Sequence, residues 1–270
     1  MQEESLLSII TINLNRADDL VRTMESVVRQ PGLEQVEYIV IDGGSTDGSV
    51  DRIQEYAAEI THWVSERDSG IYAAMNKGIL RATGRYLLFL NAGDTLYPGA
   101  LAPALKELQG IPADIVAADV GKELGYGRVM RYAPPAVFTF KDFFLHWIPH
   151  CSAFIRRSLF VRVGRYDESL RIVSDWKFFI LAICKYEATY RHIPVLLSRF
   201  QYGGVSGKPE EQSRTESERR AVLETYFSAE YREVLQQLER RAQWRRWTGY
   251  SLLFEVLRWG RRRLYRWTGV

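Results

Sequence analysis

The chain has 270 residues, of which 46% are hydrophobic and nine are prolines, so it can bury one substantial core and still leave residues for an appendage. Its formal charge of +3 is unevenly placed: residues 239–270 carry nine arginines and two glutamates, +7, which leaves residues 1–238 at −4. The acidic main body argues against a protein that binds nucleic acid over its whole surface.

Short apolar runs alternate with helical patterns through the first hundred residues. Strands are predicted over residues 6–12, 38–41, 62–64 and 86–90. Helices are predicted between them over residues 18–30, 49–58 and 71–82. This alternation predicts βαβ units, and therefore an α/β fold with a largely parallel sheet flanked by helices.

Beyond residue 100 the pattern loosens. Residues 115–120 favour another strand and residues 121–135 a hairpin-like excursion, and a helix is predicted to begin at Ser174. A glycine-rich stretch then interrupts the pattern. We place a domain boundary there, with residues 1–206 as the main domain and residues 207–270 as a helical, basic and aromatic extension.

Other features of the sequence indicate the cellular compartment. Cys151 and Cys184 are far apart and lack CxxC spacing, so neither a disulfide framework nor a zinc ribbon is predicted, and a reducing cytosol fits. The acidic start, residues 1–5, lacks the basic region of a signal peptide, and we expect no export. The longest apolar run, residues 178–184, is far shorter than the roughly 20 residues of a membrane-spanning helix.

Two aspartates directly follow predicted strands. Asp42 follows Ile41, and Asp94 comes a short glycine-containing turn after Leu90. Aspartate and glycine also form turns and helix caps, so either position alone has a purely structural interpretation. Ligands of open parallel sheets bind at the carboxyl ends of the strands, however, and the joint occurrence of two such aspartates favours a binding site.

Four segments in order resemble glycosyltransferase family 2. They are SIITINLN at 8–15, IDGGSTDGS at 41–49, ERDSGIYAAMNKG at 66–78 and NAGD at 91–94. Weaker support comes from HCSAF at 150–154, SDW at 174–176 and GGVS at 203–206. The resemblance implies a GT-A fold, a Rossmann-like mixed and mostly parallel sheet flanked by helices. It also implies inverting transfer from a nucleotide-diphosphate sugar and a divalent metal, Mg²⁺ or Mn²⁺.

The resemblance also implies which residues bind the donor. They are Thr11, Asn13, Asn15, Asp42, Asp68, Asn76, Lys77, Asn91 and His150. Asp42 would hold the base or the ribose, since a carboxylate can accept hydrogen bonds from the uracil N3–H or from two ribose hydroxyls. Asp68 is equally suited to cap a helix that starts near Ile71, and His150 to a structural role.

Asp94 occupies the family's metal-binding position. A divalent cation that bridges the two phosphates would stabilise the departing nucleoside diphosphate, and such ions use only one or two protein carboxylates. The family's usual Asp-x-Asp is here Asn91-Ala92-Gly93-Asp94, and an amide cannot supply the missing charge. We therefore expect Asp94 as the principal ligand, with weak metal affinity when no nucleotide is bound.

Asp175 aligns with the family's catalytic base. Inversion needs one direct displacement, in which the acceptor hydroxyl loses its proton to a positioned carboxylate. Asp175 also suits a helix start, where the helix dipole favours a negative charge, and both roles are compatible.

GGVS at 203–206 is interpreted as a flap over the donor or as a linker.

The tail, residues 239–270, mixes arginine with four of the seven tryptophans, a composition typical of membrane interfaces. It predicts a cytoplasmic protein attached to the inner face of the membrane. Packing on the main domain or a subunit, nucleic-acid binding and an unstructured tail are the alternatives. Together these features predict a glycosyltransferase that acts on a glycan or lipid-linked acceptor in surface polysaccharide biosynthesis. A non-catalytic membrane- or nucleic-acid-binding protein and a nucleotidyltransferase are the alternatives; phosphate-loop and dinucleotide-binding motifs do not occur.

Overall fold

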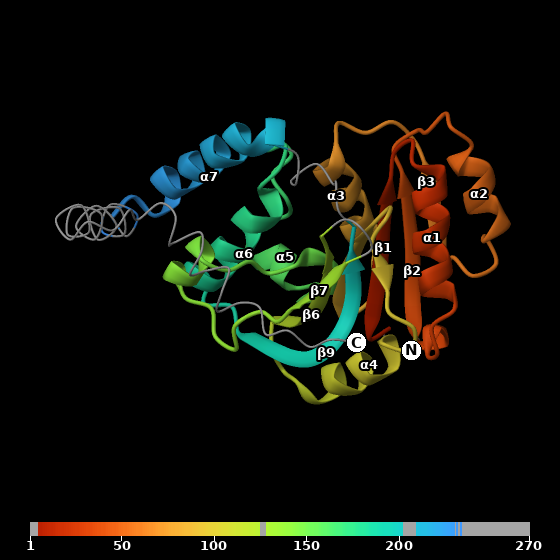
Figure 1. The fold of residues 1–270 in the computed structure, drawn as a ribbon, viewed down its shortest axis with the longest axis horizontal. Helices are drawn as coiled ribbons and strands as arrows, with labels where there is room; N and C mark the ends of the chain where they lie inside the picture. The colour runs from red at the N-terminus through yellow and green to blue at the C-terminus, as the bar shows by residue number, and fades with distance from the viewer. Residues whose placement is uncertain (1–4, 125–127, 202–208, 230, 232, 234–270) are drawn as a thin grey trace.

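The computed structural model describes residues 5–124, 128–201, 209–229, 231 and 233. Within these ranges one mixed sheet of nine strands forms the centre of the molecule, and helices cover both of its faces (Figure 1). The predicted boundary at residue 206, the GGVS segment and the basic tail lie outside the described residues. None of the described helices has the length and apolarity that a bilayer crossing requires.

The strands are β1 (Leu7–Asn13), β2 (Val36–Asp42), β3 (His62–Ser65), β4 (Tyr86–Asn91), β5 (Thr95–Leu96), β6 (Ile115–Glu123), β7 (Val129–Tyr132), β8 (Ala153–Arg156) and β9 (Tyr190–Phe200). The α-helices are α1 (Ala17–Val28), α2 (Ser49–Glu55), α3 (Ile71–Arg81), α4 (Leu101–Gly110), α5 (Leu159–Arg162), α6 (Ser174–Cys184) and α7 (Gln212–Tyr226). Short 3₁₀ helices η2 (Phe140–Phe144) and η3 (His150–Ser152) precede β8.

The sheet has the strand order β3-β2-β1-β4-β8-β6-β9-β5, and β7 pairs with β6. Strands β1 to β4 form the parallel part that the sequence predicts, with β1 between β2 and β4. Strand β8 runs antiparallel to both β4 and β6, while β6 and β9 are parallel. The β6–β7 pair is antiparallel and corresponds to the predicted hairpin-like excursion.

All seven residues of β1 are buried, because helices cover both sides of the sheet. Ile10 and Ile12 face the core beneath α3 and α6, while Leu7 and Ile9 face the core beneath α1 and α4. A Cβ at Gly78 would lie 2.4 Å from Ile10 Cγ2, so only glycine lets α3 lie this close to β1. This packing fixes the position of α3 against the sheet.

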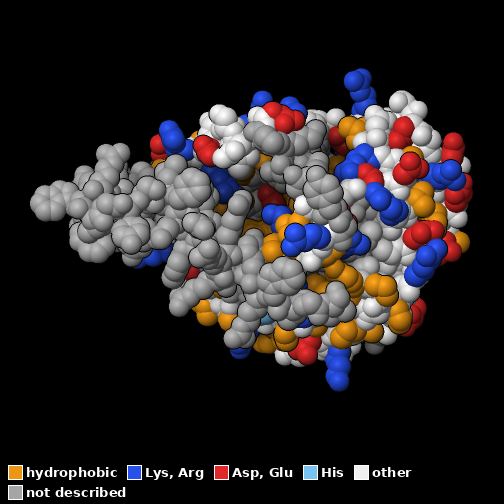
Figure 2. Space-filling view, in the orientation of Figure 1, with side chains coloured by type: hydrophobic (Ala, Val, Ile, Leu, Met, Phe, Trp, Pro, Cys, Tyr) orange, Lys and Arg blue, Asp and Glu red, His pale blue; other side chains and the backbone are white. Residues whose placement is uncertain are grey.

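Helix α7 packs against the main domain. Its Val222 and Leu223, and Phe227 beyond its end, are buried in the same core as α6. The carboxylate of Glu218 accepts hydrogen bonds from three successive backbone N–H groups, residues 171–173, immediately before α6. Over α1 and α2, acidic and basic side chains are interspersed on the face shown in Figure 2, in keeping with the near balance of charge over residues 1–238.

Candidate active site

Polar residues meet at the carboxyl ends of three parallel strands. In the β1–β2 register Asn13 lies opposite Asp42, and in the β1–β4 register Ile12 lies opposite Asn91. Because parallel strands end at the same edge of a sheet, side chains far apart in the sequence become neighbours there. The strand-end positions singled out in the sequence therefore do share one edge.

Two adjoining cavities of about 550 Å³ each open at this edge. The first, here the β1 cavity, is lined by residues that include Asn13, Arg16, Asp68 and Glu168. The second, here the aromatic cavity, contains His150 and Asp175 and is lined by Tyr72, Phe143, Phe144, Trp147, Trp176, Phe179 and Phe200. Both are lined by Ile71, Tyr72, Asn91 and Arg171, so a ligand in one can reach a ligand in the other.

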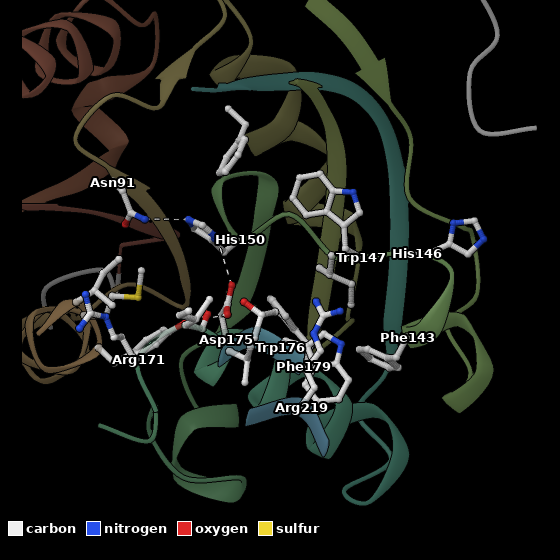
Figure 3. Close-up of a pocket in the computed structure, with 18 of the residues that line it drawn as sticks. Asn91, Phe143, His146, Trp147, His150, Arg171, Asp175, Trp176, Phe179 and Arg219 are labelled. Carbon is white, nitrogen blue, oxygen red and sulfur yellow. Dashed lines mark hydrogen bonds and ion pairs between the residues drawn. The ribbon is translucent and has the colours of Figure 1, made fainter. Parts of the chain in front are cut away.

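A chain of polar contacts, with His150 at its centre, leads from this junction into the aromatic cavity (Figure 3). The Nδ1 of His150 lies 3.5 Å from Asp175 Oδ2, and its Nε2 lies 3.2 Å from Asn91 Nδ2. In the neutral form of His150, the ring accepts from Asn91 at Nε2, because an amide nitrogen only donates, and its Nδ1–H faces Asp175. Asn91 thus selects the tautomer that supports the carboxylate.

Asp175 is held ionised. Burial alone would raise its pKa, but the hydrogen bond and charge of His150 and the hydroxyl of Tyr72, 3.0 Å from Asp175 Oδ1, hold the pKa below its ordinary value. Burial lowers the pKa of His150, and Asp175 and Asp94 more than offset this and raise it. Asp175 lies in the first turn of α6 without capping it. The site therefore offers an ionised, partnered carboxylate at the aromatic cavity.

Asp94 lies on the other side of His150, with its Oδ2 3.8 Å from His150 Nε2. It is 4% exposed, and its Oδ1 accepts a hydrogen bond from the backbone N–H of Gln201. Burial raises its pKa to about 6, against the opposing charge of His150. The charge of His150 therefore offsets only part of the cost of burying the Asp94 carboxylate.

The oxygens here fit a divalent cation. Asp94 Oδ2 and Asn91 Oδ1 are both buried, and neither has a hydrogen-bond partner among the described residues. No group of three or more histidine, cysteine or acidic side chains in that part of the chain could hold a metal by itself. Mg²⁺ and Mn²⁺ prefer oxygen ligands and often take most of them from phosphates and water, so one carboxylate and one amide oxygen suit a metal bound together with a nucleotide.

Asp42 organises the loop after β2. It is fully buried, and its carboxylate accepts hydrogen bonds from Asn13 Nδ2, from the hydroxyls of Ser45 and Ser65, and from the N–H groups of Gly44 and Ser45. These bonds outweigh burial, which would raise its pKa, and hold the pKa below its ordinary value. Asp42 thereby orients Asn13, which lines the β1 cavity with its buried Oδ1 unpartnered.

Thr11 and Asn15 line neither cavity. Thr11 is fully buried within β1 and its hydroxyl lies 3.1 Å from that of Tyr38, because the position is two residues short of the strand end. Asn15 adopts a left-handed conformation with φ of 51° and accepts from the N–H of Thr46. Thr11 therefore contacts Tyr38 within the core, and Asn15 links the loops after β1 and β2.

Asn76 and Lys77 hold the loops that border the β1 cavity. Asn76 is buried and hydrogen-bonds the backbone of Tyr166 in both directions and the carboxylate of Glu168. Lys77 donates to the carbonyl of Arg67 and pairs with Glu66, which secures the loop that carries Asp68. Asp68 lines the cavity and accepts from the N–H of Gly70 instead of capping α3.

Two residues that support Asp175 were not predicted from the sequence. Tyr72 lies within the quoted segment 66–78, but its contact with Asp175 joins residues about a hundred positions apart and has no local signal. Glu218 lies in a charged helical stretch that we assigned to the extension, and its carboxylate holds the backbone that leads into the helix bearing Asp175.

The sequence of this chain is similar to those of known proteins. The model of the family "Glycosyl transferase family 2" matches residues 8–163. An uncharacterized glycosyltransferase of Mycobacterium tuberculosis is 34% identical over 187 residues, which are 67% of this chain and 70% of the relative. The chain belongs to glycosyltransferase family 2. A second relative in the comparison, a PGL/p-HBAD biosynthesis glycosyltransferase of Mycobacterium bovis, is 31% identical over 208 residues, 74% of this chain and 79% of the relative.

Solved structures show that this family member has the predicted GT-A fold. The crystal structure of S. aureus TarS in complex with UDP-GlcNAc matches with a TM-score of 0.62 at 16% identity, over 74% of this chain and 60% of that one. Mannosyltransferase PcManGT from Pyrobaculum calidifontis, in complex with GDP-Man and Mn²⁺, matches with a TM-score of 0.57 at 18% identity, over 74% and 58%. As a member of its family the chain is an enzyme that transfers glycosyl groups.

Proposed function

We propose that this glycosyltransferase moves a sugar, with inversion, from a nucleotide-diphosphate donor, in the first place a UDP-sugar, to a hydroxyl group of a glycan or lipid-linked acceptor in surface polysaccharide biosynthesis. The observation that carries the proposal is the carboxylate of Asp175 in the aromatic cavity, hydrogen-bonded to Tyr72, which lines both cavities. Neighbouring structures with bound UDP-GlcNAc and GDP-Man support a nucleotide-sugar donor.

In the proposed reaction the donor occupies the β1 cavity, where Asn13 and Asp68 supply polar contacts and Arg16 a positive charge. The acceptor enters the aromatic cavity. Asp175 accepts the proton of the acceptor hydroxyl as that oxygen attacks the anomeric carbon from the face opposite the diphosphate. His150 and Tyr72 keep the carboxylate ionised and oriented during this step. One displacement inverts the anomeric configuration.

Asp94 and Asn91 would hold the divalent cation, Mg²⁺ or Mn²⁺. The ion would supply Lewis-acid stabilisation of the departing diphosphate. The two unpartnered oxygens, and the Mn²⁺ in the PcManGT structure, support this assignment. With a single carboxylate in the set, the affinity of the protein for metal alone should be weak.

The test is Asp175→Asn. We expect a loss of transfer of about 10² to 10⁴ in rate, because general-base catalysis contributes that much, with donor binding in calorimetry preserved. Asp51→Asn, an exposed position on α2, is the matched control and should stay active. A fully active Asp175→Asn enzyme contradicts the assignment. Product NMR reports the anomeric configuration, and retention of configuration would overturn the inverting mechanism.

The arginine- and tryptophan-rich residues 239–270 would attach the cytoplasmic enzyme to the anionic inner face of the membrane. Each arginine near such a surface contributes about 1 kcal/mol. The support is compositional, since the tail lies outside the described residues. Deleting residues 239–270 should release the protein from anionic liposomes in a flotation assay, and unchanged binding contradicts the anchor.

A further inference from the structure

The aromatic cavity holds a cation without an acidic partner. Arg219 projects from α7 into this cavity, with its guanidinium carbon 5.1 Å from the centre of the Trp176 ring. No carboxylate in the described part of the chain lies at ion-pair distance from it, whereas Arg171, which also lines this cavity, pairs with Glu211 at 3.4 Å. Figure 3 shows Arg219 beside Trp176 on the far side of Asp175 from Asn91.

Two N–H donors at this point are buried and unused. Arg219 Nε and Trp176 Nε1 are both inaccessible to solvent, and neither has a hydrogen-bond acceptor among the described residues. Burial lowers the pKa of Arg219, and Asp175 is the opposing influence. Asp175 itself is supported by His150 and Tyr72. A partly buried guanidinium with an unfilled donor is costly, so this part of the cavity suits a ligand that brings an acceptor and a negative charge.

The position of Arg219 is fixed by its neighbour in the sequence. Glu218 binds the backbone that leads into α6, and α6 carries Trp176 and Asp175. The Arg219 guanidinium, the Trp176 indole and the Asp175 carboxylate are therefore carried by two helices, α7 and α6, that Glu218 links. Around them, aromatic rings line the cavity and provide flat apolar surfaces, which suit the face of a sugar or aryl ring.

We infer that the aromatic cavity recognises an acceptor that carries an anionic group, a phosphate or a carboxylate, next to the ring whose hydroxyl Asp175 activates. The guanidinium group of Arg219 binds the anion, and the aromatic side chains bind the ring. The inference rests on the proposed function for the role of Asp175. It adds that the acceptor is charged, and that α7, from the predicted extension, selects it.

The experiment titrates the full-length protein with three aryl ligands that share a phenyl ring: phenyl phosphate, phenyl β-glucuronide and the neutral phenyl β-glucoside. Binding is followed by ligand-observed NMR. We expect at least one anion to bind about tenfold more tightly than the glucoside, since hydrogen bonds to charged groups are the strong ones. The preferred anion then distinguishes a phosphate-linked acceptor from an acidic sugar.

Arg219→Gln should abolish this preference, and Arg219→Lys should restore part of it. Arg220→Gln, the exposed neighbour on α7, is the matched control and should bind all three ligands as the wild type does. Equal affinity for the three ligands, or an anion preference that survives in a folded Arg219→Gln variant, overturns the inference. Transfer activity is measured separately, so its absence would count against the proposed function while anion binding still tests Arg219.

Discussion

The Nδ1 of His150 lies 3.5 Å from Asp175 Oδ2, and the same imidazole places its Nε2 3.8 Å from Asp94 Oδ2. One side chain thus joins the proposed base to the proposed metal ligand. When His150 is protonated, its positive charge lowers the pKa of both carboxyl groups, against burial, which raises them. His150 therefore couples the two functions electrostatically.

The first prediction concerns His150→Gln. Without the imidazole, burial dominates and the pKa of Asp175 rises. Because the base acts in its ionised form, and ionisation is lost as the pH falls through its pKa, the acidic limb of the pH–rate profile should move to higher pH. His62→Gln, outside both cavities, should leave the profile in place. An unshifted acidic limb in the His150 variant contradicts the coupling.

The second prediction concerns the stability of the metal-free protein. Burial raises the pKa of Asp94 from 3.8 to about 6, so the folded state holds its proton more tightly than the unfolded state. The stabilising contribution is present below the unfolded pKa and is lost as the pH rises through about 6. Asp94→Asn should therefore be the more stable protein at neutral pH in EDTA, by on the order of 3 kcal/mol, and similar to the wild type at low pH.

Thermal unfolding in EDTA at acidic and neutral pH measures this difference. Adding Mn²⁺ with a nucleoside diphosphate should then raise the melting temperature of the wild type but not of the variant, because only a bound ligand stabilises by mass action. An Asp94→Asn protein that melts below the wild type at neutral pH would show that the buried carboxylate has a compensating partner.

The parallel part of the fold could be predicted from the sequence because its signals are local. The strand ending at Asn13 and the one ending at Asp42 are continuous apolar runs closed by turn residues, as expected for strands covered on both faces. Strand β9 and helix α4 were not predicted. Strand β9 alternates buried and exposed residues irregularly, and its register with β6 is interrupted near Asp119, so its pairing depends on tertiary contacts.

Part of the candidate site could also be predicted from the sequence. The positions of Asn91, His150 and Asp175 came from the family resemblance, and the structure brings them together. The sequence could not show the role of each residue. A motif that resembles the family's does not indicate which side chain faces a cavity and which one holds a loop. Asn76 lies in such a motif and is turned toward the backbone of Tyr166.

The third prediction concerns Gly43→Ala. A Cβ at this position would lie 2.8 Å from Asp68 Oδ2, so the carboxylate that lines the β1 cavity must move. If Asp68 binds the donor, the donor KM should rise about tenfold, the loss of one hydrogen bond to a charged group, with kcat nearly unchanged. Gly110→Ala is the control, because a Cβ there meets nothing within 4 Å.

A double-mutant cycle sharpens this prediction. Asp68→Ala should raise the donor KM to a similar extent, and adding Gly43→Ala to it should cost little more, because both changes act through one carboxylate. Fully additive effects would mean that Gly43→Ala acts on the donor by another route, such as the loop that Asp42 holds.

The fourth prediction concerns Glu218→Ala. The Glu218 carboxylate accepts from three backbone N–H groups, at 3.0 to 3.2 Å, which its loss would leave without their protein partner. We expect the free energy of unfolding to fall by about 1–3 kcal/mol in urea titrations. Because these groups precede the helix that carries Asp175, kcat should fall while the donor KM stays constant. Glu216→Ala, exposed on the same helix, is the control and should change neither the free energy of unfolding nor kcat. A Glu218→Ala enzyme with wild-type kcat would show that α7 does not support catalysis.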